Sequence, residues 1–249
     1  MKTKIFILAV LILPIAAMGQ IFHKNVDISE VKVTPPVFAG VEIVPDEPDS
    51  QDNFLAKYLA EYFQYPAHAK QCGDQGTGIV QFVVQPDGRL TDFHVINSVC
   101  RELDKEFIRV IKTTEGMWKP GSNNGNPVQM EKEVSMMFVA DCEWCNNKPR
   151  EYFMKQAKAY FAKANALFLE KHNLKKALRN YNLTVKYLPY DESALLLRGL
   201  CRYENGNMEE ARTDWERINK IGGSFDASPY LEELTSLKGY NEMMATLEK

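Results

Sequence analysis

A residue pattern in the last third of the chain returns after 34 residues. Asn165, Asn173, Ala177, Tyr181 and Leu183 are followed by Gly199, Asn207, Ala211, Trp215 and Arg217, and four of these five positions keep their size class or type. This period is typical of a repeat made of two short helices. Such a unit cannot bury its apolar face alone, so it must stack on a neighbour, which creates a grooved surface for binding other proteins. We therefore predict an all-α unit at 150–249 that serves contact rather than catalysis.

The two copies resemble tetratricopeptide repeats in their small, aromatic and closing residues, which include Ala164, Phe168 and Pro189. This resemblance implies that the first helix of each pair lines a groove for a partner. The predicted lining is Ala159, Ala162, Ala166, Leu169, Ser193, Leu196, Leu200 and Tyr203. Residues at helical spacing are also typical of a packed core, and that alternative stays open. Two copies fall short of the roughly three that stability usually needs, so we expect support from a last helix, from the preceding domain or from a partner.

The N-terminus predicts export. Lys2 and Lys4 precede an apolar stretch at 5–17, and small residues then favour cleavage before Gln20. The alternative is an uncleaved membrane anchor, but a span needs about 17–25 apolar residues. We therefore expect a signal peptide at 1–19, a periplasmic location and no membrane span in the mature chain. A Pro-rich, acidic segment at 20–52 is predicted to be an extended lead-in.

Residues 53–141 predict a small α+β domain with the order helix, hairpin, helix, strand. Apolar residues at helical spacing mark a first helix at 54–63, and Leu103 to Ile111 mark a second. Between them, alternation at 80–84 leads into the turn pair Asp87-Gly88, a strong hairpin signal. The alternation at 128–138 predicts a third strand that is buried on one side. We expect this strand to lie at an edge of the sheet, where unpaired backbone groups can accept a partner strand.

An ordered series of residues in this region resembles the TonB C-terminal domain. The series consists of Tyr65-Pro66-Ala67-His68-Ala69, Gly73, Gly76, Phe82, Asp87-Gly88, Val95, Ser98, Leu103-Asp104, Trp118-Lys119-Pro120, Gly125 and Pro127-Val128. It covers about residues 36–140. This resemblance implies a periplasmic module that pairs its edge strand with a short receptor segment. The binding strand would comprise Val134, Ser135, Met136, Met137 and Phe138.

Together these features predict a periplasmic binding protein that acts as an adaptor or accessory in TonB-dependent outer-membrane transport. Its partners would be proteins, including TonB-dependent outer-membrane receptors, and a second partner would bind the repeats. The alternative is an envelope assembly scaffold with no role in energy transduction. A lead-in of about 30 residues reaches roughly 100 Å at most, so the sequence favours binding over force transmission. The net charge of −3 gives no electrostatic reason to expect nucleic acid.

The cysteines are the residues that could suggest chemistry. Cys142 and Cys145 form a C-x-x-C pair in the predicted linker at 142–149, without the βαβ surroundings of a redox centre. A local disulfide, differently paired thiols and redox activity are all open for this pair. Cys72 and Cys100 flank the open end of the hairpin and are candidates for a second disulfide. A structural zinc site would need four Cys or His ligands; we therefore predict a protein that is not an enzyme, with no catalytic residues, metal or cofactor.

Overall fold

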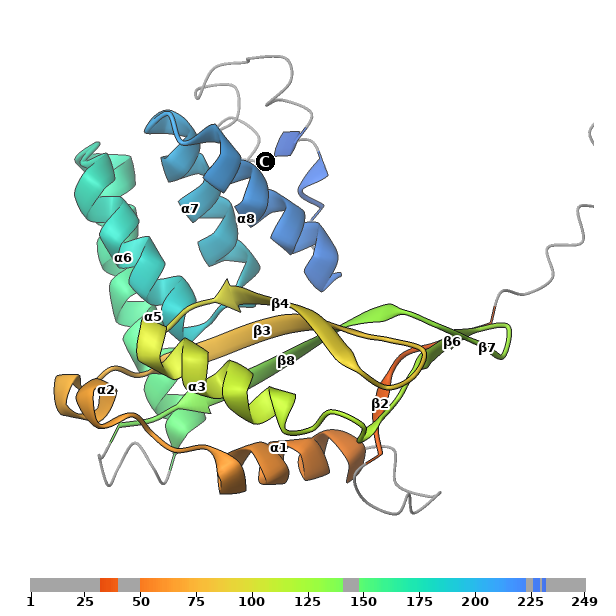
Figure 1. Ribbon diagram of the computed structural model, residues 1–249. Coiled ribbons are helices and arrows are strands. Elements are labelled where there is room, and N and C mark those ends of the chain that lie inside the picture. Colours follow the sequence, from red (N-terminus) through yellow and green to blue (C-terminus); the bar gives the residue numbers. More distant parts are fainter. Residues whose placement is uncertain (1–31, 40–49, 141–147, 223–225, 229, 232–249) are drawn as a thin grey trace, which may run out of the picture.

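The computed structural model describes residues 32–39, 50–140, 148–222, 226–228 and 230–231. Figure 1 shows a three-stranded sheet with helices on both faces, because a helical unit from the second half of the chain lies on one side of it. The predicted signal peptide and the Cys142–Cys145 pair lie outside the described residues. No helix of the described part is long and apolar enough to cross a membrane.

The sheet has the order β4-β3-β8, and both neighbours run antiparallel to the central strand. Its strands are β3 (Gly76–Val84), β4 (Leu90–Asn97) and β8 (Met130–Phe138). The predicted hairpin joins β3 to β4, and Gly88 at its turn has a φ of 82°, which glycine adopts without steric cost. The third strand is confirmed as an edge strand of this sheet among the described residues.

Three helices lie beneath the sheet: α1 (Ser50–Tyr62), α2 (Ala67–Cys72) and α3 (Arg101–Lys112). Acidic residues in the first turn of α3 and basic residues in its last turn favour the helix electrostatically. Its apolar stripe packs against the face of the sheet that carries Phe82 and Phe138. The predicted order of helix, hairpin, helix and strand is observed, with α2 as an addition.

Short strands extend the domain beyond the sheet. These are β1 (Val33–Thr34), β2 (Val37–Phe38), β5 (Trp118–Lys119), β6 (Gly121–Asn123) and β7 (Asn126–Val128). The first two come from the predicted lead-in and pair with β6 and β5. The described part of the lead-in is therefore built into the domain, because its strands complete pairs with the segment that follows α3.

The helical unit consists of successive packed helices. They are α5 (Pro149–Asn165), a π-helical turn η2 (Ala166–Glu170), α6 (Leu174–Tyr187), α7 (Glu192–Glu204) and α8 (Met208–Ile221). Helix α5 packs on α6, α6 on α7 and α7 on α8. This arrangement buries a core of its own, so helical character is observed for the described residues of the predicted region, and 232–249 lie outside them.

The 34-residue pattern corresponds to equivalent contacts in the two halves of this unit. The Tyr181 hydroxyl donates to Oδ1 of Asn165 over 2.9 Å. The corresponding Trp215 packs directly against Gly199, where a side chain would overlap the indole ring. Ala177 and its counterpart Ala211 are both fully buried. The repeat therefore reflects two similarly packed helix pairs.

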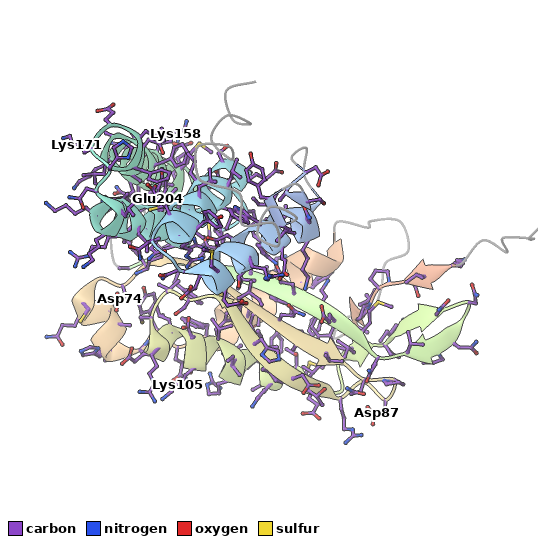
Figure 2. The ribbon with its side chains drawn as sticks, turned by 90° about the horizontal axis from the view of Figure 1, so that it is seen from above. Asp74, Asp87, Lys105, Lys158, Lys171 and Glu204 are labelled. Atoms are coloured by element: carbon purple, nitrogen blue, oxygen red, sulfur yellow. The ribbon has the colours of Figure 1, made fainter. Side chains whose placement is uncertain are left out.

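The helical unit docks on the face of the sheet opposite α1 and α3. Ile79 of β3 is fully buried there, and the Thr77 hydroxyl donates to the carbonyl of Tyr187 over 2.9 Å. Seen from above in Figure 2, the unit covers the end of the sheet near Asp74 and leaves the hairpin end at Asp87 uncovered. The expectation that the third strand is buried on one side is confirmed: Val134 and Phe138 are buried on the face toward α1 and α3, whereas on the second face Ser135 and Met137 stay exposed and only Glu133 is half-buried.

Candidate protein-binding site

The outer edge of β8 is a long and regular strand edge. Its nine residues pair one-to-one with β3, from Met130 opposite Val84 to Phe138 opposite Gly76, without a register shift. No described strand pairs with its other side. In an antiparallel sheet, every second residue of an edge strand points its N–H and C=O away from the sheet. This edge therefore offers unpaired donors and acceptors to an added strand.

The opposite edge of the sheet, at β4, is irregular. Its pairing with β3 shifts register between Ile79 and Val80 and again between Gln81 and Val83. Asp92 of β4 has a φ of 52°, a conformation that few residues other than glycine adopt. Bulges of this kind twist an edge and interfere with further pairing. The two edges thus differ, and β8 is the better template for a partner strand.

A groove lies between the β8 edge and α1. It is lined by Leu55, Ala56 and Leu59 of α1 and by residues 132–135 of β8, with a volume of about 230 Å³. The α1 side is apolar, and Val134 on the strand faces the same core. An extended segment beside β8 could place small apolar side chains here.

A second groove lies between β8 and the helical unit. It has a volume of about 480 Å³, and its lining includes Ser135 and Met137 of β8, Arg150 of α5, and Leu188 and Tyr190. Both Met137 and Tyr190 are 43% exposed. The β8 edge is therefore flanked by one groove on each face of the sheet.

A half-buried ion pair joins the helical unit to β8. The terminal guanidinium nitrogens Nη1 and Nη2 of Arg217 donate to Oε2 and Oε1 of Glu133, at 2.6 and 2.5 Å. The Tyr190 hydroxyl donates to the same carboxylate over 3.0 Å, and the Arg217 guanidinium lies over the Tyr190 ring. Burial opposes ionisation of Glu133, but the hydrogen bonds and charge of Arg217 outweigh it and hold the pKa of the carboxyl below its usual range. Bidentate pairing of this kind gives a defined geometry.

The predicted strand residues divide between the two faces of the sheet. Val134 and Phe138 are buried against the helices below, and Met136 is half-buried on the same face. Ser135 and Met137 are exposed and line the second groove. The structure thus makes the backbone edge and two of the five side chains accessible, while the binding role of the strand stays a prediction.

The predicted lining of the repeat groove is not brought together as one surface. Leu196, Leu200 and Tyr203 are buried in the core of the helical unit. Their side chains belong to the packed-core alternative, because the neighbouring helices cover them. The remaining members have exposed or half-buried side chains: Ala159, Ala162, Ala166, Leu169 and Ser193.

The disulfide proposed between Cys72 and Cys100 is not formed, and both thiols are free. Cys72 ends α2, where its sulfur lies 3.8 Å from Nε2 of His68 one turn earlier. Cys100 instead lies at the N-cap position of α3, where its side chain makes no capping hydrogen bond, and burial raises the pKa of its thiol. Cys201 is fully buried, as expected for an apolar filler, and burial raises its pKa to about 12. Among the described residues, no group of three or more His, Cys, Asp or Glu side chains could hold a metal ion.

The sequence did not predict the contacts of Glu133 on β8 with Arg217 and Tyr190 of the helical unit. Glu133 was placed on the polar side of its strand, and neither Arg217 nor Tyr190 belongs to a binding motif. Glu133 follows two other charged residues, Glu131 and Lys132, so nothing in the local sequence set it apart or identified its partners.

A small sheet with a hairpin, two long helices on one face and a regular free edge defines a class of protein-interaction domain. Residues 61–140 match the family model described as Gram-negative bacterial TonB protein C-terminal. This part of the chain therefore has a TonB C-terminal-like fold. The match ends before the helical unit, so the tetratricopeptide assignment stays a prediction.

Two solved structures of the TonB C-terminal domain from Helicobacter pylori, determined by NMR in solution, are similar to this chain at 18% sequence identity. One covers 36% of this chain and 95% of its own length, with a TM-score of 0.30. The other covers 40% and 89%, with a TM-score of 0.33. At these scores the superpositions carry no argument of their own. No curated protein matches the sequence.

Proposed function

We propose that this chain is a protein-binding protein of the cell envelope that captures an extended segment of its partner on the edge of β8. The observation that carries the proposal is the uninterrupted register of β8 with a groove on each side of its free edge. Addition of a strand to such an edge gives affinity through main-chain hydrogen bonds and specificity through pockets for alternate side chains.

The similarity to the TonB C-terminal family supports a more specific role. We place the chain in the periplasm, as an adaptor or accessory in TonB-dependent outer-membrane transport, with a segment of an outer-membrane receptor as its partner. The family is one of non-catalytic interaction domains, which agrees with a binding role. A second partner on the exposed part of the helical unit belongs to the same proposal.

A proline scan of 134–137 tests edge pairing. The N–H direction alternates along a strand, so prolines at 134 and 136 affect one side of β8 and prolines at 135 and 137 affect the other. Proline removes a donor and fixes φ. One pair of variants should lose ladder hydrogen bonds to β3 and unfold at lower temperature. The other pair should stay folded by circular dichroism but lose the partner.

The binding measurement is a pull-down from envelope extract with the purified full chain. We expect wild type to capture an outer-membrane transporter and the folded proline variants to capture none. Equal capture by wild type and the folded variants would rule out edge pairing. Capture of envelope proteins without any transporter would favour the scaffold alternative.

A further inference from the structure

The two grooves beside β8 would receive opposite faces of one added strand. Successive side chains of a strand point to opposite sides of the sheet. Partner residues beside Lys132 and Val134 would thus point toward α1, and those beside Ser135 and Met137 would point toward the helical unit. Every second side chain of the partner would therefore contact the helical unit, which lies outside the TonB C-terminal-like domain.

The wall formed by the helical unit is held in place before any partner binds. Tyr190 is fixed by its hydrogen bond to Glu133 and by the Arg217 guanidinium, 5.3 Å from its ring centroid. At the other end of the groove, Phe153 of α5 packs edge-on against Tyr187 with ring centroids 5.1 Å apart, and it is 1% exposed. Preorganisation of this kind lowers the entropic cost of binding.

The lining of the second groove includes both apolar side chains and a cation. Met137 and Tyr190 are large apolar side chains that remain 43% exposed while lining the same groove. Arg150 lies one turn of α5 before Phe153, is exposed and has no ion-pair partner among the described residues. Asp191 also lines the groove, but its carboxylate caps α7 by accepting from the Ala194 N–H at 2.8 Å.

The α1 side carries a cation too. Lys132 lines the first groove and likewise has no ion-pair partner in the described part of the chain. In an antiparallel or parallel pair, opposite charges on neighbouring strands attract, and like charges repel. The edge is thus flanked by one unpaired cation on each face, which favours an acidic partner segment.

We propose that the helical unit is the second wall of the β8 site, and that the resulting slot selects an extended acidic peptide segment. One face of this segment carries small apolar side chains toward α1 and a carboxylate near Lys132. The other face carries an apolar side chain over Met137 and Tyr190 and a carboxylate for Arg150. The inference rests on the proposed edge pairing and adds the chemistry of the partner.

The test is a phage-displayed library of random eight-residue segments, selected on the full chain. Wild type should enrich segments in which each of the two faces, that is, each set of alternate positions, carries both an apolar residue and an Asp or Glu. Arg150→Glu should select a basic residue in place of one of these acidic residues, and Lys132→Glu should reverse the preference at another. The matched controls are Arg179→Glu on α6 and Lys105→Glu on α3, both exposed and outside the grooves; they should select the wild-type pattern.

A synthetic peptide of the enriched sequence then gives affinities by fluorescence anisotropy. Loss of an exposed ion pair together with the added repulsion in Arg150→Glu should weaken binding roughly tenfold. Arg179→Glu should stay within about twofold. Unchanged selection and affinity in Arg150→Glu would overturn the inference, as would a library from which wild type enriches nothing.

The folded proline variants separate this inference from the proposed function. Suppose that they lose the peptide while Arg150→Glu and Lys132→Glu bind it normally. Edge pairing then stands, and the inference that Arg150 and Lys132 select acidic side chains of the partner is wrong. If they still bind the peptide, edge pairing itself is wrong, and the inference falls with it.

Discussion

Replacement of Gly199 by alanine tests whether the 34-residue pattern reports close helix packing. A methyl group at Gly199 would lie 2.8 Å from both Cδ1 and Cε2 of Trp215, and it would overlap Nε1 more severely. Ordinary contact begins near 3.4 Å, so the ring would have to move by at least about 0.6 Å. Trp215 is fully buried and packs against Tyr203 and Tyr230, which leaves it little room.

The expected magnitude follows from two opposing effects. Overpacking of a core costs about 1–3 kcal/mol, and the severe overlap with Trp215 places Gly199→Ala near the upper end. Alanine in a helix interior is favoured over glycine by about 1 kcal/mol. We therefore expect a net loss of about 2 kcal/mol in the free energy of unfolding, measured by urea titration with circular dichroism.

The sign of the change decides the matter. Without a packing constraint, Gly199→Ala would stabilise the helix by about 1 kcal/mol, and that result would refute our reasoning. Trp215→Leu provides the matched background, because leucine has no atoms beyond Cδ and so lacks those that overlap the methyl group at the positions of Nε1 and Cε2. In that background Gly199→Ala should cost little or stabilise, which gives a coupling energy of about 2 kcal/mol between the two positions. Additive effects would contradict direct contact.

Two further predictions concern titratable groups. Because the folded pKa of Glu133 is lowered, its ionised form stabilises the fold above the ordinary pKa of a glutamate, and this contribution is lost as pH falls through the lower folded value. Glu133→Gln should thus cost about 2 kcal/mol at pH 7 and progressively less on acidification in urea titrations; a difference that does not change with pH would contradict this. In chains with one remaining cysteine, Cys72 should react with Ellman's reagent at pH 8 within minutes. Cys201, fully buried with a pKa of about 12, should react only after unfolding. Equal reaction rates for Cys72 and Cys201 in the folded chain would show that Cys201 is accessible rather than buried.

Local signals in the sequence predicted much of the sheet domain. The pair Asp87-Gly88 predicted the hairpin, and the apolar stripe of α3 predicted that helix, because turn chemistry and helical periodicity act between near neighbours. The sequence did not predict α2 or the strands at 33–38. A two-residue strand and a six-residue helix are too short to show a periodic pattern of apolar residues.

The position of the helical unit depends on contacts between residues far apart in the chain. Arg217 and Glu133 are 84 residues apart, and Tyr190 and Glu133 are 57 apart. Neither residue type nor spacing identifies such a pair. For the same reason the predicted groove included Leu200, whose helical periodicity fits a core as well as a binding surface, and which the structure places in the core.

The docked helices change what the free edge of β8 can do. A three-stranded sheet with one open face could bind partners by packing on that face, but here Ile79 is buried and Glu133 is paired with Arg217. The register shifts of β4 interfere with pairing at the other edge. The proposed addition of a strand to β8 uses the edge of the described sheet that has no register shift and no paired neighbour. Because the helices that close the face also border this edge, they can add side-chain selectivity to a main-chain contact that has little of its own.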